Sequence, residues 1–177
     1  MKVTLSGERI ILRQPKEGDL EKRFSYGRNS DIVRMFGGDS KNIAPLSVEE
    51  VSAWIEGIQQ APYAWVVEHD GHLIGEAKLH SINEHDHRAR YAIGFYDPAK
   101  LGLGLGQEAT RIVLRYAFEE LKLHRVDLRV LAYNVRAVNC YKKCGFIIEG
   151  TERESAYVDG EWHDDLIMSM LAKEFIE

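Results

Sequence analysis

The sequence predicts an α/β fold, in which a mixed sheet and its helices form one domain over residues 1–177. Two observations lead to this prediction: extended apolar segments come first, and strand and helix patterns then alternate up to a closing hairpin. The length of 177 residues suits one domain, and 45% hydrophobic with 29% charged residues is typical of a globular chain. Neither a repeat nor a low-complexity linker interrupts the pattern.

The first part of the chain predicts one strand and two helices. A short run of branched apolar residues at positions 9–13 predicts a strand, and residues 19–26 have the pattern of a short helix. Ser47 and Glu50 form a capping box, which marks the start of a longer helix. Its apolar residues follow helical spacing: Val51, Trp54, Ile55 and Ile58. Residues 37–45 are polar and irregular, so we expect a loop there.

The middle of the chain predicts three consecutive strands. An Asp-Gly turn at residues 70–71 separates the apolar run 63–69 from an extended segment at 72–82. A polar turn at 83–86 leads into the third strand, residues 89–96. Strands joined by such short turns pair antiparallel, so this part of the sheet is expected to be antiparallel.

From residue 104 the spacing of the apolar residues becomes helical. A single apolar stripe runs along residues 104–121 and predicts a long helix, and residues 125–131 predict a strand. Asn134 is a suitable N-cap for a short helix that ends before Gly145. A hairpin closes the chain, with a strand from residue 146, a turn at 158–160 and a strand at 165–171.

Charge and cysteine content restrict the partners and the compartment. A net charge of −5 and a pI near 5.8 argue against nucleic-acid binding driven by phosphate attraction. The first residues lack the apolar core of a signal peptide, and no stretch approaches the ~20 apolar residues of a membrane span. Cys140 and Cys144 lie on consecutive turns of one predicted helix, where a disulfide would constrain little. We therefore expect a cytoplasmic protein with reduced thiols and no membrane partner.

The segment between the third strand and the long helix is rich in glycine: Leu101, Gly102, Leu103, Gly104, Leu105, Gly106 and Gln107. Glycine lets backbone N–H groups approach a bulky anion, and the helix N-terminus adds unpaired donors and partial positive charge. The loop therefore predicts a pyrophosphate site. The alternative is a tight strand-to-helix turn without a ligand.

Dinucleotide binding is a second interpretation of the same glycines. Gly104, Gly106 and Ala109 fit the pattern G-x-G-x-x-A, and Asp127 lies near the spacing of a ribose-binding acid. However, that fingerprint normally follows the first strand of its domain, and here at least three strands precede it. Asp127 also falls near the start of its strand rather than the end. The nicotinamide-dinucleotide hypothesis is the weaker one.

A second motif follows the loop. Asn134, Ala137, Tyr141, Gly145 and Phe146 form the pattern N-x-x-A-x-x-x-Y-x-x-x-G-F. Together with the glycine loop, this motif resembles the GNAT superfamily of N-acetyltransferases over residues 9–175. The resemblance is closest to the branch of ribosomal-protein alanine and spermidine N-acetyltransferases. Further stretches support it: residues 89–94, 106–109, 123–126, 149–150 and 159–164.

The resemblance implies a splayed, mostly antiparallel sheet with helices on both faces, the acyl-CoA N-acyltransferase fold. It also implies acetyl transfer from acetyl-CoA to a primary amine, either a protein N-terminus or a small molecule such as a polyamine. The splay would lie between strands 89–96 and 125–131. Many members of the superfamily form homodimers.

The resemblance also assigns roles to individual residues. The backbone of Phe95 and Tyr96 would line the acetyl and pantetheine arm, the loop from Leu101 to Gln107 would bind the pyrophosphate, and Asn134 and Asn139 would bond the cofactor backbone. The family usually has Arg or Gln where this chain has Leu101, and often Lys where it has Leu103. Two alternatives follow: backbone donors hold the phosphates unaided, or cofactor affinity is reduced and the chain is a non-catalytic acyl-CoA-binding module.

Tyr141 would be the general acid, and its chemistry fits that role. Amine attack on a thioester expels a thiolate whose conjugate acid has a pKa of ~8.5, whereas tyrosine keeps its proton up to ~10. A tyrosine beside the sulfur is therefore a loaded proton donor. The alternative is a packing role, because Tyr141 shares a helix face with Val138.

The sequence leaves the general base unassigned. An alkylamine with a pKa of ~10.4 is mostly protonated at neutral pH, so its proton must be removed. Glu76 and His80 share one strand face and are candidates, either directly or through water; the alternative is a solvated surface. His80, His85, Asp86 and His87 crowd a turn without the spacing of a zinc site, so we predict no metal.

Overall fold

The computed structural model describes residues 2–176. The strands are β1 (Leu5–Ser6), β2 (Ile10–Arg13), β3 (Ala64–His69), β4 (His72–Asn83), β5 (Arg88–Phe95), β6 (Arg125–Leu131), β7 (Ile147–Val158) and β8 (Glu161–Leu171). The α-helices are α1 (Asp19–Tyr26), α2 (Ser30–Met35), α3 (Val48–Gln60), α4 (Leu105–Arg115) and α5 (Val135–Cys144). Short 3₁₀ turns, η1 (Pro98–Lys100) and η3 (Ala172–Glu174), and a π-turn, η2 (Tyr116–Glu120), complete the elements.

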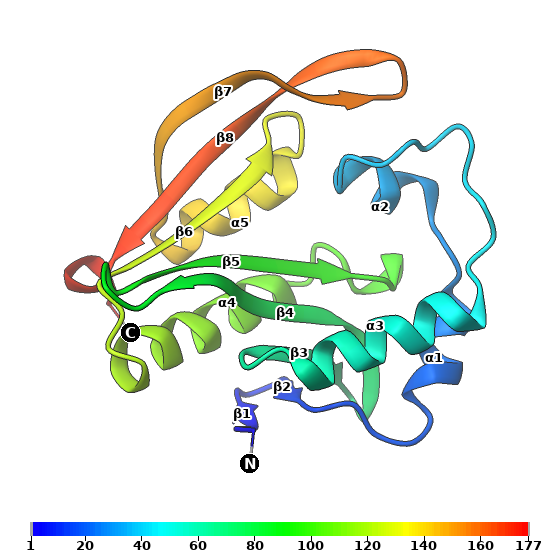
Figure 1. The fold of residues 1–177 in the computed structure, drawn as a ribbon, viewed down its shortest axis with the longest axis horizontal. Coiled ribbons are helices and arrows are strands. Elements are labelled where there is room, and N and C mark those ends of the chain that lie inside the picture. Colours follow the sequence, from blue (N-terminus) through cyan, green and yellow to red (C-terminus); the bar gives the residue numbers. More distant parts are fainter. Residues whose placement is uncertain (1, 177) are drawn as a thin grey trace.

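The strands in the described range form one eight-stranded sheet in the order β1-β2-β3-β4-β5-β6-β8-β7. Every neighbouring pair is antiparallel except β5 and β6, which run parallel. In Figure 1 the sheet extends from β1 and β2 at the lower edge to the β7–β8 hairpin at the upper edge. The predicted mixed, mostly antiparallel sheet is confirmed.

The parallel pair β5–β6 is the place where the sheet opens. The two strands pair only at their beginnings, from Arg88 with Arg125 to Arg90 with Asp127. Beyond these residues they diverge, as Figure 1 shows. The predicted splay between these strands is therefore present, and it leaves one edge of each strand without a ladder partner.

Helices cover both faces of the sheet, because side chains of a strand alternate between its faces. On β3, Trp65 and Val67 belong to the main core, which also includes apolar residues of α4 and α5. Ala64 and Val66 point the other way into a smaller cluster with Ile58 of α3. The main core supports the glycine loop, and the smaller cluster supports α1 and α3.

An ion-pair cluster fixes the end of β2 to the start of α1. The Arg13 guanidinium donates two bonds to the Asp19 carboxylate, at 2.7 and 2.9 Å, and also pairs with Glu68 of β3. These three side chains are buried, while Lys16 adds a more exposed contact to Glu68. The cluster sets where α1 leaves the sheet.

The structure differs from the sequence prediction in three places. The short strand β1 and helix α2 were not predicted. The long helix predicted for residues 104–121 ends as an α-helix at Arg115 and continues as the π-turn, where Leu121 N–H bonds to Tyr116 O at 3.0 Å. There the Tyr116 ring packs edge-on against Trp65, with centroids 5.8 Å apart.

Candidate active site

The splay opens into a cleft of about 710 Å³. The end of β5, the loop before α4, and α5 line it, together with residues of α2, β6 and the β7–β8 hairpin. Tyr141 and most of the predicted cofactor residues contribute to the lining: Phe95, Leu101, Gly102, Gly104, Gly106, Gln107, Asn134 and Asn139. Tyr96, Leu103 and Leu105 are not among the lining residues.

The loop between η1 and α4 owes its shape to two glycines in the left-handed region. Gly102 has φ 77°, and Gly104, the N-cap of α4, has φ 80°. A residue with a Cβ adopts such angles only at a cost of about 1–2 kcal/mol. The conformation turns the chain sharply into α4 and leaves the loop backbone uncovered on the cleft side.

The backbone N–H groups from Gly102 to Gln107 donate to no acceptor in the described part of the chain. Glu108 donates the first bond at this end of α4, to the Gly104 carbonyl at 3.1 Å. Unpaired N–H groups at a helix N-terminus carry partial positive charge and bind anions. The residues present thus fit a diphosphate group.

Neighbouring side chains hold this loop in place. Arg9 donates to the Leu103 carbonyl at 3.1 Å and pairs with Glu108 at 2.9 Å, and Glu108 accepts the backbone N–H groups of Arg9 and Ile10. Leu105 is buried in the core, and the Leu103 side chain is 53% exposed. Leu101 packs against the core and lines the cleft. Arg9, directly before β2, and Glu108 of α4 therefore hold the loop in position.

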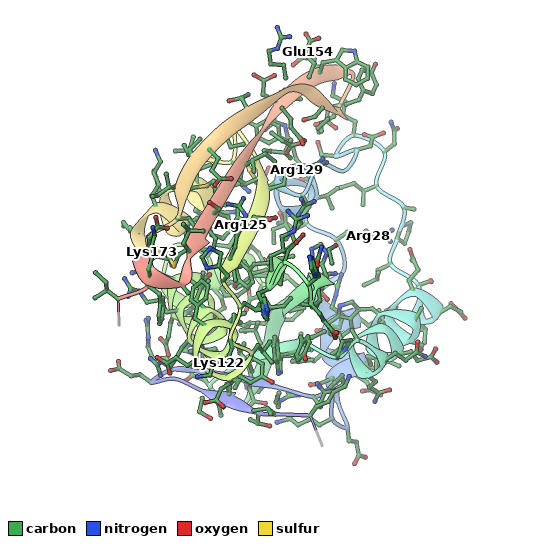
Figure 2. The ribbon with its side chains drawn as sticks, turned by 60° about the vertical axis from the view of Figure 1, so that its left-hand side comes forward. Arg28, Lys122, Arg125, Arg129, Glu154 and Lys173 are labelled. Atoms are coloured by element: carbon green, nitrogen blue, oxygen red, sulfur yellow. The ribbon has the colours of Figure 1, made fainter. Side chains whose placement is uncertain are left out.

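Positive charge surrounds the cleft beside the loop. Lys100, Arg136 and Lys143 line it, and none of them pairs with a carboxylate among residues 2–176. Arg129 also lines the cleft, but it is balanced by Glu152 at 3.1 Å and Asp165 at 3.4 Å. Figure 2 shows Arg125 and Arg129 along β6, with Glu154 at the outer end of the hairpin. The surplus cations lie where an anionic cofactor would need them.

Tyr141 is buried at the cleft wall with its ring held by two aromatic neighbours. Its ring meets Tyr91 and Phe146 edge-on, with centroids 6.4 and 5.8 Å apart. Its hydroxyl bonds to no other residue that the structure describes. Burial, with the nearby thiols of Cys140 and Cys144, raises the pKa of Tyr141. The Tyr141 hydroxyl is therefore protonated at neutral pH and free to donate a hydrogen bond or a proton at the cleft.

The two predicted asparagines differ in availability. Asn134 caps α5, accepting the Ala137 N–H at 3.2 Å, and donates to the Met35 carbonyl at 3.3 Å. Asn139 is exposed, and its side chain bonds to none of the described residues. Asn139 can thus meet a ligand directly, while Asn134 chiefly joins α5 to α2.

At the end of β5, successive N–H groups point to opposite edges of the strand. Tyr96 N–H bonds to the Ile74 carbonyl of β4 at 2.8 Å, so the preceding N–H, that of Phe95, points toward the splay. The Tyr96 ring lies away from the cleft, against Trp54 and Arg23. Phe95, rather than Tyr96, thus presents a backbone donor to the cleft.

Comparisons with known proteins agree with this geometry. Residues 9–147 match the family model "Acetyltransferase (GNAT) domain". The chain belongs to the GNAT acetyltransferase family. It is 31% identical to a spermidine N(1)-acetyltransferase of Vibrio cholerae, over 94% of this chain and 95% of that protein. The predictions of the family and of an N-acetyltransferase are confirmed.

Solved structures of GNAT acetyltransferases share the fold. A spermidine N-acetyltransferase from Vibrio cholerae, in complex with CoA and spermine, superposes with a TM-score of 0.79 at 26% identity, covering 97% of this chain and 100% of that one. An acetyltransferase from Bacillus anthracis gives a TM-score of 0.82 at 22% identity, with coverage of 97% and 100%. The predicted fold class is confirmed.

In this GNAT acetyltransferase, the two candidate bases lie outside the cleft lining. The Glu76 carboxylate accepts the Trp54 indole N–H at 2.5 Å, on the face covered by α3. His80 contacts Ser81 at 3.0 Å, and burial, followed by the charges of Lys78 and Arg90, lowers the pKa of its imidazole. The two residues share a face, as strand parity predicts. It is the face on which the Phe36 ring covers Gly94, the cross-strand neighbour of Glu76, but neither candidate base is among the residues that line the cleft.

Sequence reasoning missed Phe36, which lies directly after α2. Its ring lies over β5 at Gly94, where an added Cβ would stand 2.4 Å from Cζ. Gly94 is therefore needed for the close approach of the ring, which is 59% exposed and lines the cleft. Asn29, the N-cap of α2, followed by apolar Ile32, was the signal available in the sequence.

The loop after Phe36 is fastened to the β7–β8 turn. Asp159 accepts the Ser40 N–H and hydroxyl at 2.7 and 2.6 Å, and its carbonyl accepts from Lys41 at 2.8 Å. These bonds, with the charges of Lys41 and Arg34, lower the pKa of Asp159. The far end of the cleft is thus bordered by two segments joined through one side chain.

The described residues lack two features. Over residues 2–176, no group of three or more His, Cys, Asp or Glu side chains could hold a metal ion. No helix in the same range has the length and apolar character needed to cross a membrane.

Proposed function

We propose that this GNAT acetyltransferase moves the acetyl group of acetyl-CoA to a primary amine by direct attack. The observation that carries the proposal is the row of N–H groups from Gly102 to Gln107, which have no partner in the described chain. Four of these residues line the same cleft as Tyr141, whose hydroxyl is free: Gly102, Gly104, Gly106 and Gln107. One end of the cleft thus suits a diphosphate and the other suits a departing thiolate.

The main contacts to the cosubstrate would come from backbone groups, and side chains would add further contacts. The loop amides would hold the diphosphate, and Lys100, Arg136 and Lys143 would complement the remaining phosphate charge. Asn139 would bond the pantetheine arm where it passes α5. The leucines at 101 and 103 remove no donor from this set, because the donors are main-chain groups.

The transfer step would form one bond and break another. The amine nitrogen attacks the thioester carbonyl carbon, the C–N bond forms and the C–S bond breaks. The Phe95 N–H polarises the carbonyl oxygen. Tyr141 gives its proton to the departing thiolate sulfur and regains one from water.

The amine proton would pass to water in the open cleft. Glu76 and His80 lie outside the lining, and Glu76 is already held by Trp54. Activity should therefore rise with pH toward the pKa of the free amine, which is ~10.4 for an alkylamine. Glu76→Gln should leave this pH profile unchanged.

The test measures free thiol released from acetyl-CoA across a panel of primary amines. The panel holds a polyamine, an N-terminal peptide, an amino sugar and amino acids. We expect thiol release in stoichiometric match with acetylated product. CoA binding without thiol release by any amine would indicate a binding module, and binding of NAD in place of CoA would support the dinucleotide hypothesis.

A further inference from the structure

A second cavity of about 330 Å³ adjoins the cleft on the side of α1 and α2. Ile32, Phe36 and Gly37 line both cavities, so the two spaces share one wall. Phe36 belongs to this wall, and its ring lies over Gly94 of β5. A ligand in the second cavity would therefore lie next to the site of transfer.

Arg23 is the main charged group of this cavity, which we call the Arg23 pocket. Its guanidinium stacks 3.8 Å from the centroid of the Tyr96 ring and donates one bond, to the Gly27 carbonyl at 3.0 Å. The Tyr96 hydroxyl is a second polar neighbour of the guanidinium, and no carboxylate in the described chain pairs with Arg23. The guanidinium is held in position and still has an open hydrogen-bonding edge.

Two further donors face the same space. Asn29 uses its side-chain oxygen to cap α2, through the Ile32 N–H at 3.1 Å, and its amide NH₂ group has no partner in residues 2–176. Arg28 donates to the Ala44 carbonyl at 2.7 Å and pairs with Glu50 at 2.5 Å. Arg28, labelled in Figure 2, is therefore largely neutralised, and Arg23 supplies the net charge.

The rest of the lining is apolar or neutral. Ile32, Val33 and Phe36 form apolar walls, and no Asp or Glu is among the described residues of the lining. The carboxylate of Glu76 is bonded to Trp54 and does not belong to the lining. The pocket thus offers donors and positive charge, and its described lining has no carboxylate that would attract a cation.

We propose that the Arg23 pocket binds a carboxylate carried by the acceptor amine, an inference that rests on the proposed acetyl transfer. A guanidinium edge matches a carboxylate with two parallel bonds, and stacking on Tyr96 fixes its plane. Because Phe36 stands between the pocket and the cleft, carboxylate and amine must be separated by a flexible chain. The acceptor is thus an ω-amino acid rather than a polyamine, whose ammonium groups Arg23 would repel.

The experiment compares matched pairs of amines that differ only in the carboxylate. Thiol release gives kcat/KM for 6-aminohexanoate against hexylamine, and for lysine against 1,5-diaminopentane. We expect wild-type protein to prefer the carboxylate-bearing partner, and Arg23→Gln to lose about 10- to 100-fold on that partner alone, the usual effect of a lost charge-assisted bond. Arg23→Lys should retain part of the preference.

Lys22→Gln is the matched control, because it removes the same charge from the same helix outside the pocket. Lys22→Gln should leave kcat/KM unchanged for all four amines of the two matched pairs. Wild-type indifference to the carboxylate, or an equal loss on both partners in Arg23→Gln, would overturn the inference. If Arg23→Gln does not fold, the kcat/KM values of the wild-type protein for the matched amines decide whether the inference holds.

A binding measurement separates this inference from the proposed function. Calorimetric titration of 6-aminohexanoate into the protein with CoA present needs no turnover. Binding that Arg23→Gln weakens, without thiol release from any amine, would contradict acetyl transfer and support the pocket. Thiol release with polyamines, without measurable binding of 6-aminohexanoate, would support transfer and overturn the pocket.

Discussion

The hydroxyl of Tyr141 is the group that performs the proposed proton transfer, and Tyr141→Phe removes it while keeping the ring. The ring contacts with Tyr91 and Phe146 remain in the variant. No described residue loses a hydrogen-bond partner, because the hydroxyl has none. We therefore expect the free energy of unfolding to change by less than about 0.5 kcal/mol.

The effect on turnover follows from the leaving group. General acids typically contribute 10²- to 10⁴-fold, and a thiolate with a conjugate-acid pKa of ~8.5 needs less help than an alkoxide. We expect the lower end, a loss of about 100-fold in kcat, which corresponds to about 2.7 kcal/mol in the barrier. The affinity for CoA should stay within about twofold, because no loop amide changes.

Tyr91→Phe is the control variant, for which we expect the opposite pattern: lower stability and unchanged turnover. Its hydroxyl is buried and bonds to Thr110 at 3.1 Å, so the variant should lose about 1 kcal/mol of stability and keep its turnover. Thiol-release kinetics and urea unfolding on both variants give the comparison. Unchanged turnover in Tyr141→Phe, or equal losses of turnover in both variants, would refute the assignment of Tyr141 as the acid.

Three further predictions concern the loop and the frame. Gly104→Ala, at φ 80°, should either lower the free energy of unfolding by about 1–2 kcal/mol or shift the loop and weaken CoA binding, measured by calorimetry, about tenfold. Gly57→Ala, where a Cβ meets nothing within 4 Å, should change neither stability nor CoA binding in this way. Arg13→Met leaves two buried carboxylates facing an apolar group and should lower the free energy of unfolding in urea by about 3–5 kcal/mol; a loss below 1 kcal/mol would contradict this. Arg125 at 2.6 Å, with Ser169, holds the pKa of Glu149 at about 2, below the ordinary 4.5 of a glutamate. The stabilisation from this carboxylate is therefore present above pH 4.5 and is lost as pH falls toward 2. Glu149→Gln should thus lower the melting temperature at pH 7. The loss in free energy of unfolding should be less than about 1 kcal/mol, because the carboxylate is half-exposed, and the difference in melting temperature between wild type and variant should narrow below pH 4.5.

Features set by neighbouring residues could be predicted from the sequence. The Ser47–Glu50 capping box is present with both of its bonds, and Asp70 and Gly71 turn with φ 50° and 76°. Gly145 ends α5 with φ 102°. Each depends on a local backbone requirement that one or two residue types satisfy, so the pattern alone indicates the structure.

Features set by distant residues could not be predicted in the same way. Helix α2 is short, and its last turn is held by Tyr133 and Asn134, which bond to the carbonyls of Arg34 and Met35 from across the chain. Strand parity placed Glu76 and His80 on one face, but only the packing of Trp54 shows which face it is. The two cavities that meet at Phe36 likewise depend on how α2 lies over β5.

The measurement that tests the central claim most directly is a crystal structure of this protein with CoA. The account predicts diphosphate oxygens about 2.7–3.2 Å from backbone nitrogens between Gly102 and Gln107, with the CoA sulfur beside the Tyr141 hydroxyl. A diphosphate bound elsewhere, or loop amides turned away from it, would contradict the account.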